Sequence, residues 1–259
     1  MKVHQIYTGN DLRNFNYIIE FENQKALVID PWDAIEINNF LDENNLQPKA
    51  ILNTHEHWDH VQGNLELVKK HNCEVWAHEN GRNKIPGLTR TLQVGEEIIL
   101  DQSSKLVVLD TPGHTMAHLC FLLIENDHPI AVFTGDTLFN AGVGRCDSGG
   151  AVDVLYHTIT EQFASLDDDV VVYPGHEYLE NNLNFTLSLE PSNETAKEWL
   201  VKTKKSDPFV QPLTTTIGDE REINTFFRLD NEEIKDNLNQ EFNSELEVFA
   251  KLRATRNSW

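Results

Sequence analysis

Up to residue 176 the chain alternates short apolar runs with turn-forming residues, which is typical of a domain built from β-strands. Two segments differ, because the apolar positions within 35–41 and 61–68 recur at helical spacing. Residues 78–97 are rich in turn formers, so we expect a long loop there. The expected strands cover residues 15–21, 26–30, 50–52, 74–77, 98–100, 106–109, 119–124, 130–133 and 170–173.

The pattern changes after residue 176, where strand signals stop and apolar residues recur at helical spacing. Several prolines punctuate this last part of the chain. We therefore predict an α/β protein in two parts: a sheet-containing domain at 1–176, and a helical domain at 177–259 that packs against it. The expected helices cover residues 178–189, 194–205, 219–227 and 243–256.

Side chains that can bind metal gather just after the strand predicted at 50–52. The stretch Thr54-His55-Glu56-His57-Trp58-Asp59-His60 places five such side chains in six consecutive positions. In extended backbone the side chains of His55 and His57 point the same way, so they can coordinate one ion. Asp59 and His60 lie further round the turn and are better placed for a second ion. Without a cation, apposed like charges in this stretch would cost stability, which favours a metal site.

Three more predicted strands end at a glycine beside a histidine or an aspartate. Each short motif alone is more typical of an ordinary turn, because glycine lets the backbone turn sharply. All the candidates together suit two metal ions that share one carboxylate. They are His55, His57, Asp59, His60, His114, Asp136 and His176. His78 and His118 could donate hydrogen bonds to these ligands, although the pattern leaves their roles open.

Seven ligands for two ions leave open coordination positions, whereas a structural zinc site is closed by four protein ligands. The pattern therefore favours catalysis over a binding module that a metal merely stabilises. Two adjacent metal ions can generate a hydroxide near neutral pH and polarise a carbonyl group. A hydrolase is the function class that these observations favour.

The surface charge limits the choice of partners. The chain has 42 acidic and 21 basic residues and a formal net charge of -21, so it should repel nucleic acid and anionic membranes. An anionic substrate would need a local basic patch. The three cysteines form no CxxC pair, and neither a signal peptide nor an apolar run of membrane-spanning length is visible, so we expect a cytoplasmic protein.

Taken together, these motifs resemble the metallo-β-lactamase superfamily. Residues 54–60 match its Thr-His-x-His-x-Asp-His signature, and His114, Asp136 and His176 match its later motifs. The whole chain is similar to one branch, the hydroxyacylglutathione hydrolases or glyoxalase II enzymes. The branch-specific segments are Ile85-Pro86-Gly87, Gly135 to Phe139, Gly144-Arg145, Pro174 to Tyr178, Thr215 to Glu220, Asn224 to Arg228 and Phe249 to Arg256.

The resemblance implies an αββα sandwich with a C-terminal helical domain beside the cleft. It implies two divalent ions, zinc first with iron or manganese as alternatives, and hydrolysis of S-D-lactoylglutathione to D-lactate and glutathione in methylglyoxal detoxification. We expect a monomer. Metal one would bind His55, His57 and His114; metal two would bind Asp59, His60 and His176; Asp136 would bridge them. The residues that would contact the glutathione moiety are Arg145, Tyr178, Arg253 and Arg256.

The chain also departs from the family pattern. Asp147 stands where the family commonly has an aromatic residue, which leaves the thiol carrier open. Arg253 and Arg256 lie three apart and could form a carboxylate-binding patch, or simply place favourable cations at a helix C-terminus. The alternative enzyme is a persulfide dioxygenase of the same fold that uses one iron, but such enzymes generally lack the long helical extension.

Overall fold

Two six-stranded sheets pack against each other at the centre of the fold. The computed structural model describes residues 1–259, the whole chain. The first sheet runs in the order β1 to β6, with bounds Lys2–Tyr7, Phe15–Phe21, Lys25–Ile29, Gln47–Leu52, Glu74–His78 and Leu88–Leu92. The second has the order β14-β13-β10-β9-β8-β7, with bounds Thr215–Thr216, Val171–Pro174, His128–Gly135, Leu119–Glu125, Ser104–Asp110 and Glu97–Ile99. A separate hairpin consists of β11 (Leu138–Phe139) and β12 (Gly142–Val143).

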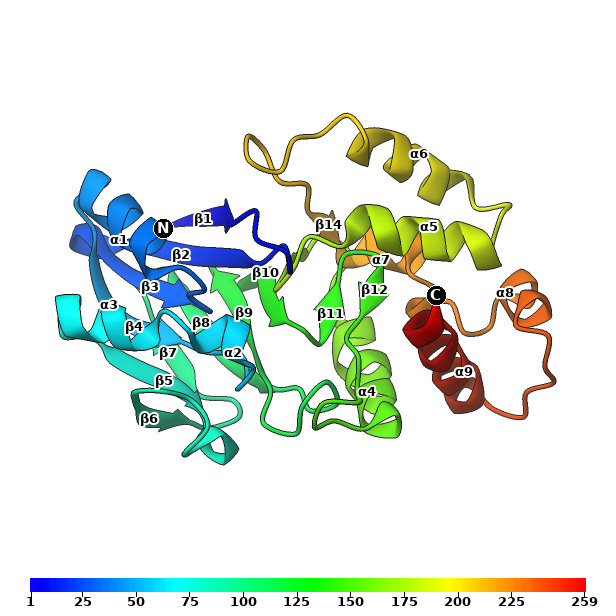
Figure 1. Cartoon of the computed structure of the whole chain (residues 1–259), viewed down its shortest axis with the longest axis horizontal. Coiled ribbons are helices and arrows are strands. Elements are labelled where there is room, and N and C mark those ends of the chain that lie inside the picture. The colour runs from blue at the N-terminus through cyan, green and yellow to red at the C-terminus, as the bar shows by residue number, and fades with distance from the viewer.

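Helices cover the outer face of each sheet and give the αββα order (Figure 1). The first sheet carries α1 (Ala34–Glu43), α2 (Trp58–Val61) and α3 (Asn64–His71). The helices on the side of the second sheet are α4 (Val152–His157), α5 (Leu179–Leu189), α6 (Glu194–Thr203), α7 (Ile217–Ile223), α8 (Glu232–Asn237) and α9 (Glu245–Ser258). Short helical turns lie at Glu22–Gln24, Glu79–Gly81, Thr158–Gln162, Phe163–Ser165 and Thr225–Phe227.

Strand β2 shows how the apolar pattern builds two cores at once. Phe15, Tyr17 and Ile19 face the second sheet, whereas Ile18 faces the opposite way and joins the cluster that contains Ile37 of α1. Successive side chains of a strand point to opposite faces, so a continuous apolar run is what a sheet buried on both sides requires. The predicted sandwich is confirmed.

The C-terminal helices share their main core with the second sheet. One cluster of 21 buried apolar residues contains Val132 of β10 and Phe163, and it also contains Phe185 of α5 and Phe249 of α9. The helical part therefore covers this sheet, as we expected, and its burial depends on the residues before 176. None of the helices combines the length and the apolar character that a membrane span needs.

Three local predictions are wrong. The expected loop at 78–97 contains β6, whose middle residues are exposed and polar, so that the strand has no apolar run. The helix expected at 61–68 is broken between α2 and α3, where the Gly63 amide donates to Pro31 and a side chain at 63 would collide with it. Strand signals do not end at 176, because β14 pairs with β13, but two residues are too few to leave a pattern.

Candidate metal centre

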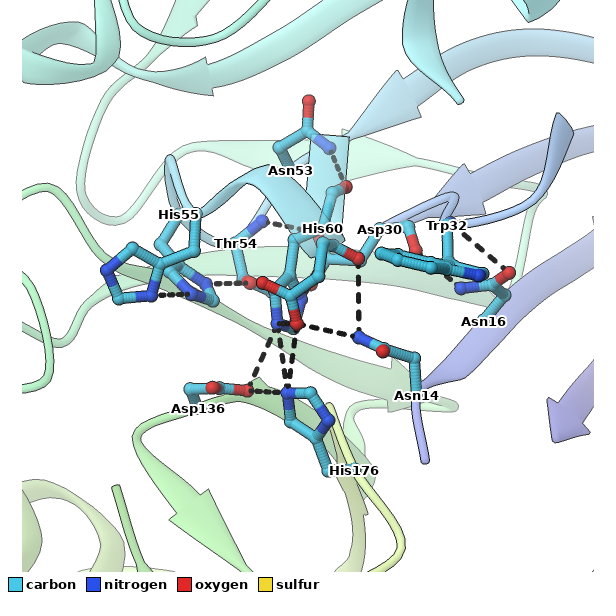
Figure 2. Close-up of polar contacts among 12 residues, drawn as sticks. Asn14, Asn16, Asp30, Trp32, Asn53, Thr54, His55, His60, Asp136 and His176 are labelled. Atoms are coloured by element: carbon cyan, nitrogen blue, oxygen red, sulfur yellow. Dashed lines mark hydrogen bonds and ion pairs between the residues drawn. The ribbon is translucent and has the colours of Figure 1, made fainter. Parts of the chain in front are cut away.

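The seven predicted ligands follow the ends of four strands and converge on one site. Strands β8, β10 and β13 run in the same direction, so His114, Asp136 and His176 emerge at the same edge of the second sheet. The first sheet supplies the remaining ligands through β4 and the short helix α2 that follows it. Figure 2 shows His60, Asp136 and His176 pointing toward one another across this junction.

Two glycines allow the backbone to pass close to the groups of the metal centre. Gly135 has a φ of 47° and packs against Thr54, so that a side chain there would be strained and would also collide. Gly175 lies so close to the Asp136 carboxylate that a Cβ would clash with it. These close contacts explain why glycine precedes a ligand at each of these strand ends.

The first cluster consists of three imidazoles and one carboxylate. The Nδ1 atom of His57 lies 3.1 Å from His55 Nε2 and 3.0 Å from His114 Nε2. The same His114 nitrogen is 3.5 Å from Asp136 Oδ2. One ligand atom from each of the four residues falls within 4.8 Å of all the others, which is the spacing expected around one ion.

The second cluster lies on the other side of Asp136. The Nε2 atoms of His60 and His176 are 3.2 Å apart, and Asp59 Oδ2 is 3.4 Å from each of them. Asp136 Oδ1 is 3.3 Å from His60 Nε2 and 3.2 Å from His176 Nε2. Asp136 thus presents one oxygen to each cluster, and its Oδ1 atom is buried without a hydrogen-bond partner.

Each ligand imidazole has its outer nitrogen next to an oxygen atom. Donation of the outer N–H to that oxygen leaves the inner nitrogen, which faces the cluster, with a free lone pair. Three such lone pairs converge in the first cluster and two in the second. The outer contacts are His55 Nδ1 to Thr54 Oγ1 (3.0 Å), His57 Nε2 to Ser148 O (3.1 Å), His60 Nδ1 to Asp30 Oδ2 (2.9 Å), His114 Nδ1 to Arg145 O (2.6 Å) and His176 Nδ1 to Leu12 O (2.8 Å).

The charge states of the clusters also favour cations. Burial lowers the pKa of His55 well below its ordinary value and also lowers the pKa of His114, so both rings are neutral ligands near pH 7. Burial opposes charge at His60 as well, but Asp136 and Asp30 raise the pKa of His60 well above its ordinary value. Burial would raise the pKa of Asp136, but His176 and His60 hold it well below the usual range.

These donor sets fit two metal ions. In the first cluster, donation of each outer N–H leaves lone pairs on the three converging nitrogens, and a cation between them removes their mutual repulsion. In the second cluster, a proton on His60 is the alternative to a cation, and metal must displace it. The donors are imidazole nitrogens and carboxylate oxygens without sulfur, a set that suits divalent transition metals. We conclude that the site is built for binuclear metal binding.

Asp30 and Asn14 contact the two clusters, although the sequence analysis did not single them out. Asp30 Oδ2 accepts from His60 Nδ1 and from Thr54 Oγ1 (2.6 Å), and its Oδ1 accepts from the Thr54 amide (2.8 Å). Asn14 Nδ2 donates to Asp59 Oδ2 at 3.0 Å. The only available signal for Asp30 was an acidic residue at the end of an apolar strand, a place where ligand sites collect.

The structure shows what His118 and His78, the two histidines whose roles were open, contact. His118 is buried and stacks on His55 at 4.9 Å, and its Nε2 atom accepts from the Asp136 amide at 3.2 Å. Burial lowers the pKa of His118 well below its ordinary value, so a neutral ring supports both clusters. His78 instead accepts from the Asn80 amide and approaches Asp110 at 3.5 Å, away from the ligands.

The four predicted substrate-binding residues have different environments. Tyr178 stacks on His176 with ring centroids 5.0 Å apart. Arg256 is partly exposed and donates to Asn182 Oδ1 at 3.2 Å. Arg145 is exposed and lies 2.6 Å from Asp147, in the loop whose carbonyl anchors His114.

Arg253 is buried rather than on the surface, with an exposed fraction of 3%. Its Nη1 atom donates to the carbonyls of Val143 (2.6 Å) and Gly144 (3.2 Å). Burial and the charge of Arg256 lower the pKa of Arg253 to about 10. We expected both arginines of α9 at the surface, but Arg253 is buried and only Arg256 is accessible.

The fold and the paired clusters define a metallohydrolase of the metallo-β-lactamase type. Residues 9–176 match the family described as the metallo-beta-lactamase superfamily, and residues 177–259 match the family described as the hydroxyacylglutathione hydrolase C-terminus. A hydroxyacylglutathione hydrolase of Nitrosococcus oceani is 44% identical over 266 residues, which cover 100% of each chain. The cytoplasmic hydroxyacylglutathione hydrolase of Arabidopsis thaliana is 32% identical over 252 residues, with 95% of each chain covered.

The chain belongs to the hydroxyacylglutathione hydrolase family, also called glyoxalase II, and it is a thioester hydrolase. The crystal structure of ETHE1 from Myxococcus xanthus has a TM-score of 0.67 and 25% identity, and it covers 100% of this chain and 99% of the other. The similarity to this structure is weaker evidence of function than the full-length matches to the hydrolases. The predicted family, fold class and enzyme activity are confirmed.

Proposed function

We propose that His55, His57 and His114 hold one divalent ion, that Asp59, His60 and His176 hold a second, and that Asp136 bridges the two. The observation that carries this proposal is the convergence of five ring nitrogens on either side of one buried carboxylate. Zinc is the preferred metal because it accepts mixed nitrogen and oxygen ligands in sites with open positions. Iron and manganese are the alternatives.

The proposed substrate is S-D-lactoylglutathione, which gives D-lactate and glutathione. When bound, the two ions would acidify water and polarise the thioester carbonyl. The protein itself orients the five imidazoles through their outer contacts and keeps Asp136 ionised. The leaving group is a thiolate, which departs readily, so the site needs no strong general acid.

The glutathione moiety would lie between the metal centre and α9. Arg256 and Arg145 offer accessible cations for its glycine carboxylate, and Tyr178 extends the surface of His176 toward them. Arg253 would act at the same place by holding the carbonyls of Val143 and Gly144, directly before Arg145. An otherwise acidic protein thus concentrates positive charge where an anionic substrate would bind.

We assign the protein to the cytoplasm and expect a monomer. All three cysteines are buried free thiols, which suits a reducing compartment. All metal ligands and all proposed substrate contacts come from a single chain, so that no second copy is needed to complete the site. Light scattering during size-exclusion chromatography tests the monomer: a mass near 29.7 kDa supports it, and twice that value contradicts it.

The proposed function is tested by elemental analysis combined with turnover. Protein purified without chelator should contain about two transition-metal ions per chain and should release thiol from S-D-lactoylglutathione. Activity lost on chelation should return when zinc is added, and parallel additions of iron and manganese identify the preferred metal. One stable ion with full thioesterase activity would contradict the binuclear site. Oxygen consumption with a persulfide, together with one iron per chain, would support the dioxygenase instead.

A further inference from the structure

A groove beside the metal centre contains charged and polar groups that neither the ligand set nor the proposed basic contacts include. It lies between the loop joining β1 to β2 and the first turns of α5, and has a volume of about 490 Å³. The residues that line it are Arg13, Tyr178, Glu180, Asn181 and Asn184.

The groove is connected directly to the metal centre. Tyr178 forms part of its lining and also stacks on the ligand His176. The groove therefore begins one aromatic ring away from the second cluster.

The loop that carries Arg13 is held firmly by its backbone. Arg13 has a φ of 60°, and its carbonyl accepts from the Glu177 amide at 2.9 Å. Its neighbours contact the metal ligands, because Leu12 O accepts from His176 and Asn14 Nδ2 donates to Asp59. The backbone at position 13 is thus tied to the metal centre on both sides, while its side chain remains half exposed at 49%.

The charges in the groove are of both signs. Arg13 lies 3.5 Å from Glu177, which is too long for a strong charge-assisted hydrogen bond. Glu180 makes no ion pair. The side-chain amide of Asn184 donates to the backbone carbonyl of Glu180 and not to its carboxylate. A simple anion would be repelled by the two glutamates, and a simple cation by Arg13. A zwitterion can satisfy both.

We propose that this groove binds the zwitterionic α-amino acid end of the γ-glutamyl group of the substrate, with its carboxylate on Arg13 and its ammonium on Glu180. This inference rests on the proposed glutathione thioester. A γ-glutamyl arm is about as long as two extended residues, so it reaches roughly 7 Å from the cysteinyl part. That length is sufficient to pass Tyr178 from the metal centre.

The experiment pairs each side chain with the charge that it should bind. The substrates are the D-lactoyl thioester of glutathione, the same thioester with its α-amino group acetylated, and the thioester of N-acetyl-cysteinylglycine, which lacks the γ-glutamyl group. The N-acetyl group of the last compound prevents migration of the acyl group from sulfur to the free amine. The variants are Arg13→Ala and Glu180→Gln.

The Arg13→Ala variant should raise KM for the glutathione thioester about fivefold to tenfold, as expected for loss of one partly exposed charged contact, with kcat nearly unchanged. Its KM for the N-acetyl-cysteinylglycine thioester should change less than about twofold, because the partner charge is missing. Glu180→Gln should raise KM about threefold for the glutathione thioester and should have no effect with the acetylated substrate.

Two controls separate binding from indirect effects. Lys105→Ala removes a partly exposed cation from a surface ion pair, 2.7 Å from Glu97 at the start of β8, and should leave KM unchanged for all three substrates. Both groove variants should retain the wild-type metal content, because the backbone hydrogen bond from the Glu177 amide to the Arg13 carbonyl does not depend on either side chain.

Equal effects of Arg13→Ala on the full and the truncated thioesters would overturn the subsite, as would no effect on either. That result would leave the proposed function standing, since the wild type would still hydrolyse the glutathione thioester. If the wild type hydrolyses no glutathione thioester, the proposed substrate is wrong and the subsite assignment is wrong with it.

Discussion

The Nε2 atoms of His60 and His176 lie 3.2 Å apart, although 116 residues separate them in the chain. Each ring has its other nitrogen next to an oxygen, Asp30 Oδ2 for His60 and Leu12 O for His176. Two ring nitrogens so oriented attract each other only through a proton or a metal ion between them. Folding of the chain therefore brings together two rings of the proposed second metal site from distant parts of the sequence.

The bridging position of Asp136 gives the most direct test of the centre. Asp136→Asn preserves the size of the side chain but removes the charge that faces both clusters, so the metal content should fall from two ions to one or fewer. Thioester hydrolysis should fall by at least about 100-fold, because both ions lose a ligand. Metal analysis and steady-state kinetics on the same preparation measure these effects.

Asp101 is partly exposed and belongs to neither cluster, so Asp101→Asn serves as the control and should keep both ions. If Asp136→Asn retains two ions and near-native turnover, the bridging assignment is wrong.

A second prediction concerns Asp30, which contacts His60 and Thr54 but lies outside the ligand set. Asp30→Ala should lower metal affinity by roughly 10- to 100-fold, because His60 loses the group that orients its ring. Isothermal titration calorimetry, with zinc added to protein from which a chelator has removed the metal, measures the affinity. The first cluster should be less affected, since Thr54 can still accept from His55. Unchanged zinc affinity at both sites would show that Asp30 has no role in orienting the ligands.

The two arginines of α9 should respond differently to removal. Arg253→Ala leaves the carbonyls of Val143 and Gly144 without their buried donor, so the free energy of unfolding should fall by roughly 2–4 kcal/mol. Arg256→Ala should hardly change stability but should raise KM for the glutathione thioester about tenfold. Urea unfolding and steady-state kinetics separate the two effects. A stable Arg253→Ala protein with a raised KM would instead make Arg253 a direct substrate contact.

A fourth prediction concerns the buried carboxyl group of Glu220 on α7. Burial raises the pKa of Glu220 to about 7, although donors from Thr215, Ala141 and Asn224 act in the opposite direction. The folded protein therefore binds one more proton than the unfolded chain between pH 4.5 and pH 7. The contribution of this group to stability is complete at low pH and is lost as the pH rises through 7.

The free energy of unfolding should accordingly contain a term from Glu220 that falls by about 3 kcal/mol between pH 4 and pH 8. Glu220→Gln should remove this slope while lowering stability overall, because an amide cannot accept from all of these donors. The exposed Glu198→Gln variant should keep the slope. Urea unfolding of the three proteins at several pH values measures it, and identical slopes in all of them would contradict the assignment.

The sequence by itself determined which residues are the proposed metal ligands, and much of the sandwich. The strands carry continuous apolar runs because both of their faces are buried, and such runs remain readable whatever the partner strand is. Ligands such as His114 and Asp136 stand at strand ends next to glycine, where local backbone rules place functional groups. The family resemblance then supplied the grouping of the ligands around two ions.

Only the tertiary structure decided which groups support those ligands and which cations remain accessible. Asp30, Asn14 and His118 act through contacts with residues distant in sequence, which no local pattern encodes. Arg253 and Arg256 appear equivalent at a spacing of three, but the packing of α9 buries the first and leaves the second accessible. The exposed strand β6 and the two-residue strand β14 were missed for a related reason: their pairing depends on backbone hydrogen bonds to neighbouring strands, and these leave no apolar pattern in the sequence.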